Sequence, residues 1–263
     1  MPRVRSLAAA QTVAVPGDVA ANVAHHVRLV HAAAGARARM LVFPELSLTG
    51  YELDLAPALA FSPGDSRLMP FLELAAAYQM TIVVGAPVRL DGLLYIGAFI
   101  VAPGGTLDLY TKHHLGAFPP SVSPDGVVPP AEATVFQAGR LNPLVRGDGG
   151  TAAVAVCADV GRPEHAHSAS ARGADTYLAS MFVIPSDVAG DTARLQTYAS
   201  RHSMAVVFSN YGGATGGLPS AGRTAIWSQR GKLLVQLPPS GAGVAVAVET
   251  EAGWQASTVM LDN

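Results

Sequence analysis

Three residues that could take part in one reaction each follow an apolar segment of this sequence. Cys157 ends the run T-A-A-V-A-V-C, Lys112 ends L-D-L-Y-T-K, and Glu45 follows M-L-V-F-P. Short apolar runs of this kind predict buried strands, and open α/β sheets present reactive groups where their strands end. A thiol, an ammonium and a carboxylate at such ends could act as nucleophile, oxyanion partner and proton carrier.

Each of these residues also has an ordinary structural interpretation. Cys157 is the only cysteine, so it cannot form a disulfide within the chain. A helix-like segment follows it, a setting that lowers a thiol pKa, although free cysteines are commonly inert buried residues. Lys112 and Lys232 are the only lysines, and Lys232 lies in an expected hairpin turn, S-Q-R-G-K. A carboxylate such as Glu45 beside a buried strand could simply pair with an arginine.

These segments resemble the signature of the carbon–nitrogen hydrolase, or nitrilase, superfamily. The stretch P-E-L-S-L-T-G-Y over residues 44–51, Y-T-K-H-H-L around Lys112 and C-A-D from Cys157 match its motifs in order. A further family pattern, E-x-x-x-F-x-x-G, is matched from Glu132, and Asn210 matches an Asn late in the family sequence. The resemblance covers almost the whole chain.

The resemblance implies a role for each matching residue. Cys157 would attack a substrate carbonyl to form a thioester, and Glu45 would carry the protons in both halves of the reaction. Lys112 would stabilise the oxyanion together with the backbone N–H of Ala158, and Glu132 would orient Lys112. The reaction implied is cleavage of a small amide or carbamoyl compound that releases ammonia or an amine, with no cofactor or metal.

The substrate itself stays open. The resemblance places further substrate contacts at Tyr51, His114, Phe182 and Asn210, with His114 supporting Lys112 by a hydrogen bond. Phe182 stands where many members have Trp, and C-A-D-V-G-R-P-E replaces the common C-Y-D-x-R-F-P-E. The same triad serves amidases, carbamoyl-amide hydrolases, nitrilases and acyl transferases, so it does not choose among them.

The elements that must position these residues alternate along the chain. Apolar runs predict strands over residues 4–15, 39–43, 81–88, 93–102, 106–112, 151–156, 177–183, 205–209, 224–236 and 244–248, with a turn at Gly231 within the run over 224–236. Helical patterns cover residues 19–34, 66–78, 164–172 and 189–202. This is an α/β pattern with too many strands for one ordinary sheet, and we expect two sheets packed face to face in a single domain over residues 1–263. The resemblance implies a four-layer α-β-β-α sandwich of two mixed sheets.

Composition restricts the partners. The chain has a net charge of −2, 14% charged residues and 50% hydrophobic residues. Without a basic stripe, nucleic acid is not an expected partner, and no apolar run is long enough to cross a membrane. The low charge predicts a buried subunit interface, hence a homodimer or higher homo-oligomer. The lone cysteine fits a cytoplasmic protein, and we interpret the N-terminal segment as a core strand rather than a signal peptide.

Other functions remain open from the residues alone. A metal-dependent amidohydrolase could use His165 and His167, and a non-catalytic binding protein could keep the same fold. The segment over residues 217–224 resembles a phosphate loop with Arg in place of Lys, but a strand-like run follows it instead of a helix.

Overall fold

Two mixed β-sheets form the centre of the molecule in the computed structural model, which describes residues 5–147 and 150–262. The first sheet contains β1 (Ser6–Gln11), β2 (Met40–Val42), β3 (Thr81–Leu90), β4 (Leu93–Val101), β5 (Leu107–Thr111), β12 (Gly243–Thr250) and β13 (Gly253–Met260), in the order β13-β12-β1-β2-β3-β4-β5. The second contains β6 (Leu144–Gly147), β7 (Gly150–Val156), β8 (Thr176–Ser180), β9 (Ala205–Ser209), β10 (Ala225–Trp227) and β11 (Leu233–Gln236), in the order β11-β10-β9-β8-β7-β6.

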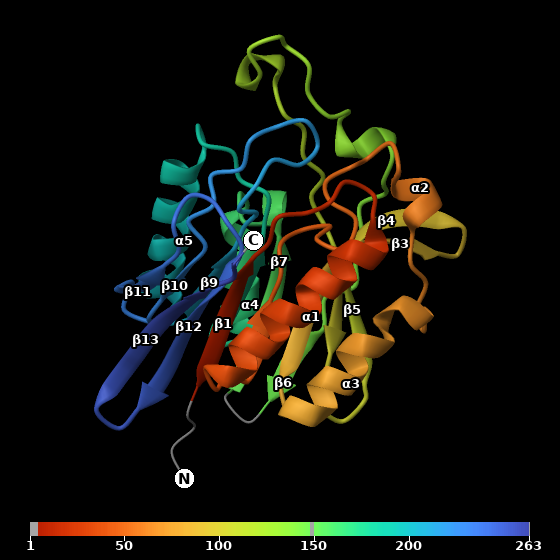
Figure 1. Ribbon diagram of the computed structural model, residues 1–263. Helices are drawn as coiled ribbons and strands as arrows, with labels where there is room; N and C mark the ends of the chain where they lie inside the picture. Colours follow the sequence, from red (N-terminus) through yellow and green to blue (C-terminus); the bar gives the residue numbers. More distant parts are fainter. Residues whose placement is uncertain (1–4, 148–149, 263) are drawn as a thin grey trace.

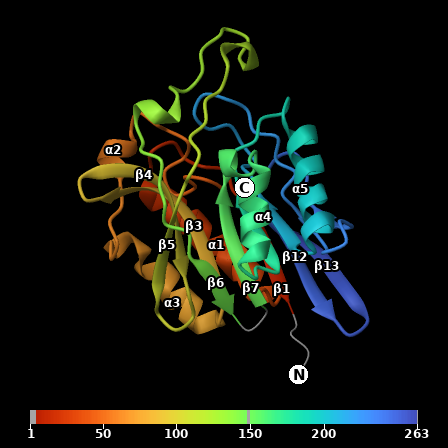
Figure 2. The same ribbon diagram turned by 180° about the vertical axis from the view of Figure 1, so that it is seen from behind.

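Helices cover the outer face of each sheet. The first sheet is covered by α1 (Val19–Gly35) and α3 (Met69–Tyr78), and the second by α4 (Pro163–Ala171) and α5 (Val188–His202). Figure 1 shows α1 and α3 on the near side, and Figure 2, from behind, shows α4 and α5 there. Because both inner sheet faces pack against each other in one apolar core, the molecule has four layers, α-β-β-α, as expected.

Parallel pairing explains the apolar composition of the central strands. β1, β2 and β3 are parallel neighbours, as are β7, β8 and β9. Parallel strands covered on both faces read as continuous apolar runs, and β8 and β9 are buried at every position. The sequence therefore predicted these strands.

The structure differs from the expectations mainly near the sheet edges. The run over residues 224–236 forms two antiparallel strands, β10 and β11, with the expected turn at Gly231 between them, whereas the strand expected over 177–183 ends at Ser180. The first expected strand begins at residue 4, outside the described residues, and β1 covers Ser6–Gln11. β6 and β13 were not predicted, and β13 is largely exposed, so it lacks the apolar pattern of a buried strand.

One end of the sandwich collects the loops that follow β2, β5 and β7. These three strands run in the same direction, so the residues after them lie at one edge of the two sheets. The loop over residues 116–131 rises above this end at the top of Figure 1. A short helix, α2 (Ala56–Leu59), lies beside it. Among the described residues, no helix is long and apolar enough to span a bilayer.

Candidate active site

A buried lysine joins two buried carboxylates at the loop-bearing end. Lys112 follows β5, and its Nζ donates one hydrogen bond of 2.6 Å to Glu45 and another of 2.6 Å to Glu132. The side chain of Lys112 is 0% exposed and that of Glu132 is 1% exposed. Burying an unpaired charge costs several kcal/mol, roughly, so each ion here depends on its partners.

The turn that carries Glu45 is held close to the sheet. Pro44 follows β2, and Leu46 has a positive φ of 52°. Gly85 in β3 lies against this turn, because a Cβ added there would be 2.5 Å from both the carbonyl of Pro44 and the amide nitrogen of Leu46. The hydroxyl of Tyr211 donates a hydrogen bond to the carbonyl of Glu45. Backbone contacts therefore fix the carboxylate from several sides.

The two glutamates have different surroundings. Both oxygens of Glu132 are hydrogen-bonded, since Tyr51 donates to Oε1 at 2.6 Å and the amide of Gly116 donates to Oε2 at 2.7 Å. Oε2 of Glu45 is buried and has no hydrogen-bond partner among the described residues. Buried polar atoms are rarely left unpaired without a reason. Glu132 is thus held in place, whereas Glu45 keeps one oxygen available.

Cys157 lies directly after β7 and completes the group. It is half-buried, and its Sγ lies 3.5 Å from the carbonyl oxygen of Phe182. Its φ is +44°, a conformation that is uncommon outside glycine and tends to occur at functional sites. Cys157 is also close enough to influence the pKa of Glu45, so the thiol and the carboxylate are neighbours.

Burial and the shared charges shift the pKa of each reactive group. Burial, opposed by Lys112 and assisted by Glu132, raises the pKa of Glu45 to about 7. Burial and the charge of Glu45 raise the pKa of the Cys157 thiol well above its usual value. Burial alone would lower the pKa of Lys112, but the neighbouring acidic groups raise it, so Lys112 stays charged.

The direction of the thiol shift corrects one expectation. A lowered pKa would require an electropositive setting, such as a long helix beginning at Cys157. The segment after β7 is instead a single 3₁₀ turn, Cys157–Asp159, and two carboxylates lie nearby. The thiol is therefore protonated at neutral pH and needs a base when it reacts.

Asp159 joins the ends of β5 and β7, and it was not among the predicted site residues. Its Oδ1 accepts hydrogen bonds from the backbone amides of His113 and His114 and, at 2.8 Å, from Nδ1 of His114. Its Oδ2 accepts from the hydroxyl of Tyr110 at 2.7 Å and from the amide of Val156. The expectation that His114 hydrogen-bonds Lys112 is therefore wrong, because its ring binds Asp159 and Lys112 binds the two glutamates. The only sequence signal for Asp159 was its place in the C-A-D motif.

The remaining predicted residues surround the same group. The ring of Phe182 lies 5.0 Å from that of Tyr51, measured between centroids, and Ala158 is part of the turn that begins at Cys157. The side chain of Asn210 hydrogen-bonds to the backbone of Val183. It accepts a hydrogen bond of 2.9 Å from the amide and donates one to the carbonyl. It therefore fixes the segment that carries Phe182. Direct substrate contact by these residues stays a prediction.

The histidines proposed for a metal do not face one site. His165 is buried and hydrogen-bonded to the hydroxyls of Tyr110 and Tyr177, while His167 is exposed on the same helix, with its ring 5.9 Å from that of His202. Among residues 5–147 and 150–262, no group of three or more His, Cys, Asp and Glu is arranged to hold a metal ion.

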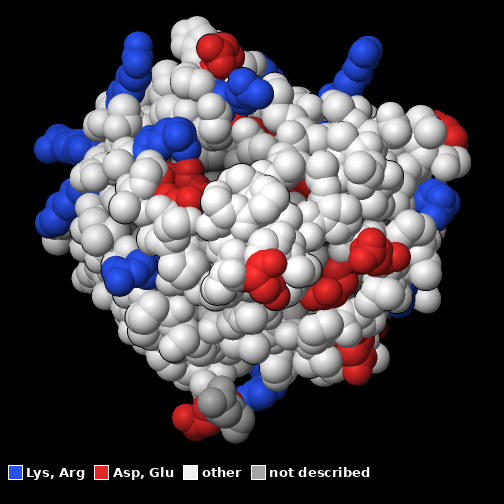
Figure 3. All heavy atoms as spheres, turned by 90° about the horizontal axis from the view of Figure 1, so that it is seen from above, with Lys and Arg blue, Asp and Glu red and all other residues white. Residues whose placement is uncertain are grey.

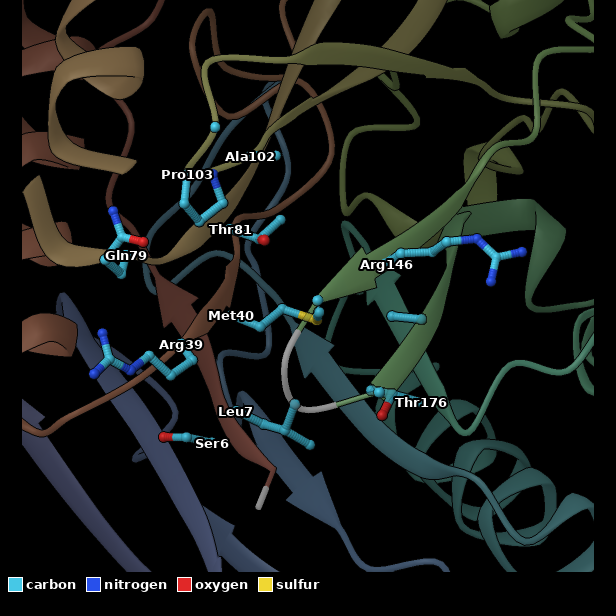
Figure 4. Close-up of a pocket in the computed structure, with 14 residues that line it drawn as sticks. Ser6, Leu7, Arg39, Met40, Gln79, Thr81, Ala102, Pro103, Arg146 and Thr176 are labelled. Carbon is cyan, nitrogen blue, oxygen red and sulfur yellow. The ribbon is translucent and has the colours of Figure 1, made fainter. Parts of the chain in front are cut away.

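One cavity lies beside the site and another lies at the far end of the sheets. One of about 570 Å³ touches Tyr51 and the loop over residues 123–130, close to the catalytic candidates. Another, of about 260 Å³, lies where β1, β2, β3, β7 and β8 begin, so it is at the opposite end of the sheets. Figure 4 shows this second cavity, with Arg39 and Arg146 on its two sides. The first includes Tyr51, whose hydroxyl donates to Glu132.

Comparison with known proteins agrees with the geometry. The family model "Carbon-nitrogen hydrolase" matches residues 3–254. A curated protein described as "Hydrolase in pqqF 5'region", from Pseudomonas protegens, is 29% identical over 90% of this chain and 76% of its own length. The glutamine-dependent NAD(+) synthetase of Mycobacterium tuberculosis is 28% identical over 89% of this chain, which spans only 37% of the synthetase.

Solved structures show the same fold. An amidase from Nesterenkonia sp. AN1, carrying the acetamide moiety of fluoroacetamide on its active-site cysteine, matches with a TM-score of 0.78 and 22% identity over 94% of this chain and 91% of that one. Nit3 of Saccharomyces cerevisiae, a nitrilase-superfamily member, matches with a TM-score of 0.83 and 16% identity over 95% and 92%. With motifs, fold and family model in agreement, the chain belongs to the carbon–nitrogen hydrolase family.

Proposed function

We propose that this protein is a thiol amidase that cleaves the C–N bond of a small amide or carbamoyl compound. The observation that carries the proposal is the bridge of Lys112 between Glu45 and Glu132, placed beside the only cysteine of the chain. This arrangement supplies a nucleophile, a proton carrier and a fixed positive charge in one buried site.

The reaction proceeds in two halves. Sγ of Cys157 attacks the carbonyl carbon while Glu45 takes the thiol proton, and the resulting oxyanion is stabilised by Lys112 and the backbone N–H of Ala158. The intermediate collapses, Glu45 gives its proton to the leaving nitrogen, and ammonia or an amine departs from a thioester. Water then attacks the thioester as Glu45 takes a proton from it. The acid leaves, and the proton returns to the thiol.

The pKa shifts favour Glu45 as the shared acid and base. A carboxyl with a pKa of about 7 exchanges protons in both directions at neutral pH, which suits a group that must act twice. The thiol, whose pKa is raised, depends on that base for its attack. The free Oε2 of Glu45 is available for this transfer, while the oxygens of Glu132 are fully occupied.

The relatives support this chemistry without determining the substrate. The Nesterenkonia amidase has an active-site cysteine that takes up the acetamide moiety of fluoroacetamide, and the synthetases depend on glutamine, which is an amide. A metal-dependent reaction has less support because His165 and His167 face different surroundings. A binding protein without turnover would have no use for a buried, unpartnered carboxylate oxygen beside a thiol.

The test is ammonia release from a series of small amides, carbamoyl compounds and nitriles. We expect at least one amide or carbamoyl compound to be hydrolysed by the wild type, and Cys157→Ala to lose this activity while keeping its circular dichroism spectrum and melting temperature. Iodoacetamide should inactivate the wild type, and a chelator should not. Hydrolysis by folded Cys157→Ala at the wild-type rate would exclude the thioester route.

A further inference from the structure

The walls around Cys157 are aromatic and aliphatic. The rings of Tyr51, Phe118 and Phe182 contact one another, with centroid separations of 5.0 Å between Tyr51 and Phe182, 5.4 Å between Phe118 and Phe182, and 5.8 Å between Tyr51 and Phe118. The backbone of Phe182 also touches Sγ of Cys157. An acyl group bound to this cysteine therefore lies next to an aromatic cluster.

The loop above the site adds further apolar side chains. Half-buried hydrophobic residues of the segment after β5 pack onto the inter-sheet core beside Cys157, namely Leu115, Phe118, Val122 and Val128. Figure 3 looks onto this end of the molecule, where uncharged residues cover most of the face and several acidic side chains lie among them, some close to its centre. Apolar side chains of this loop and the thiol thus pack on the same core.

The charges of the site leave nothing to neutralise an anion. Lys112 is the cation of the site, and both of its carboxylate partners are within hydrogen-bond distance. The cavity beside Tyr51 is lined by Glu52, Asp54 and Asp125, and no Lys or Arg of the described chain lines it. A substrate carboxylate would lose water there without gaining a counter-ion, and neighbouring like charges would repel it.

We propose that the site accepts amides whose acyl group is uncharged and apolar, and that it excludes those whose acyl group carries a carboxylate. The inference rests on the proposed function and narrows its substrate class. Phe118 is the specificity-determining residue, because its ring contacts the two aromatic residues, Tyr51 and Phe182, of the loops after β2 and β8. Glutamine and carbamoyl amino acids fall outside this class.

The first experiment measures charge selection without requiring hydrolysis. Iodoacetamide and iodoacetate differ by one negative charge, and the single cysteine makes the labelled position unambiguous in intact-mass spectrometry. We expect the rate ratio of iodoacetamide to iodoacetate on Cys157 to exceed that on N-acetylcysteine by at least about tenfold, as one uncompensated charge in a partly desolvated site implies. A ratio at or below that of N-acetylcysteine overturns the proposal. Cys157→Ala, which should take up neither reagent, is the control.

The second experiment compares two amides of matched shape. 4-Methylpentanamide and succinamate carry an isopropyl group or a carboxylate at the end of the same two-carbon chain. We expect kcat/KM to be at least about a hundredfold larger for 4-methylpentanamide, because pockets discriminate strongly when a buried charge lacks a partner. Equal or faster hydrolysis of succinamate overturns the proposal.

A variant pair tests the role of Phe118. Phe118→Ala should lower the ratio of kcat/KM for 4-methylpentanamide to that for acetamide by about tenfold, the order of magnitude for lost apolar contact with a substrate. Met69→Ala, an exposed position at the start of α3, should leave the ratio unchanged. An unchanged ratio in Phe118→Ala removes Phe118 from the proposal.

The amidase proposal and the proposed substrate class can be contradicted separately. If no compound is hydrolysed but iodoacetamide still reacts selectively, the amidase proposal is wrong and the charge selection of the site stands. If succinamate or glutamine is hydrolysed best, the amidase proposal stands and the substrate class is wrong.

Discussion

Lys112 contacts two glutamates that differ in how completely they are hydrogen-bonded. Glu132 accepts hydrogen bonds from Lys112, Tyr51 and the amide of Gly116, whereas Oε2 of Glu45 has no hydrogen-bond partner among the described residues. A fully occupied carboxylate can orient a cation but has little capacity to accept another proton. We therefore assign proton transfer to Glu45 and the positioning of Lys112 to Glu132.

The geometry at Lys112 requires an ammonium rather than any positive charge. We expect Lys112→Arg to lose activity nearly as severely as Lys112→Ala, by about a hundredfold or more in kcat, because a planar guanidinium cannot replace a compact charge between two carboxylates. Steady-state ammonia release measures this. Lys232→Arg, at an exposed turn, is the matched control and should retain wild-type activity. A fully active Lys112→Arg would show that charge alone suffices.

The pH profile separates the two glutamates. Glu45 must be ionised to act as a base, so kcat/KM should fall as the pH drops below about 7, the pKa to which burial raises this carboxyl. Glu45→Gln should block both acylation and deacylation. Since the charge of Glu132 helps to raise that pKa, Glu132→Gln should retain slower turnover and move the acidic limb to lower pH.

Intact-mass spectrometry with a slow amide or ester substrate gives the second readout. The wild type should show an acyl adduct on Cys157, and Glu45→Gln should not. If Glu45→Gln forms and releases the adduct at the wild-type rate while Glu132→Gln does not, the two roles are reversed.

The sequence could predict these reactive residues because each follows an apolar strand and lies in a recognisable motif. It could not predict the pKa of Cys157, which depends on carboxylates that are distant in the chain. Nor could it show that His114 binds Asp159, because that contact depends on how the ends of β5 and β7 meet. The sequence shows the types and order of these residues, but it does not show which residues they contact across the two sheets.

At the scale of the elements, Asp159 connects the strand that carries Lys112 to the strand that carries Cys157. It accepts hydrogen bonds from the hydroxyl of Tyr110 in β5 and from the amide of Val156 in β7. Five donors converge on this one buried carboxylate. Its loss would alter the relative position of the two strand ends.

We expect Asp159→Asn to lower kcat by about tenfold or more with little change in KM, because an amide nitrogen would face donors that now bind a carboxylate oxygen. Misplaced reacting groups are known to cost rate strongly, which gives the direction. Asp175→Asn, at the other end of the sheets, should leave kcat unchanged. Steady-state kinetics and thermal melts of both variants check this. Equal kcat in the two folded variants would make Asp159 dispensable for positioning.

The strands that the sequence revealed are those buried on both faces. The sequence did not predict β13, which is a mostly exposed edge strand. Its polar and apolar residues follow one another without regular alternation. The turn between β10 and β11 could be predicted because Gly231, which has a positive φ, marks it. Edge strands depend on the neighbour they pair with, and local sequence does not record that neighbour.

At the scale of the whole molecule, the low charge and high hydrophobic content predict self-association. Only 14% of the residues are charged, and exposed apolar side chains occur on several elements, among them Met69, Leu93 and Met260. Light scattering at micromolar concentration should therefore report at least a dimer. A mass near 27.0 kDa, that of one chain, would contradict this expectation. The single-domain organisation likewise stays a prediction.

The reactive groups come from both sheets, and this has a consequence for folding. Glu45 and Lys112 follow strands of the seven-stranded sheet, and Cys157 follows a strand of the six-stranded one. The sheets are joined by side-chain hydrogen bonds, such as that from Ser180 to the carbonyl of Phe43. Either sheet could form alone without assembling the site. During refolding, the return of Cys157 to its native alkylation rate would therefore time the docking of the two sheets, separately from the appearance of strand signal in circular dichroism.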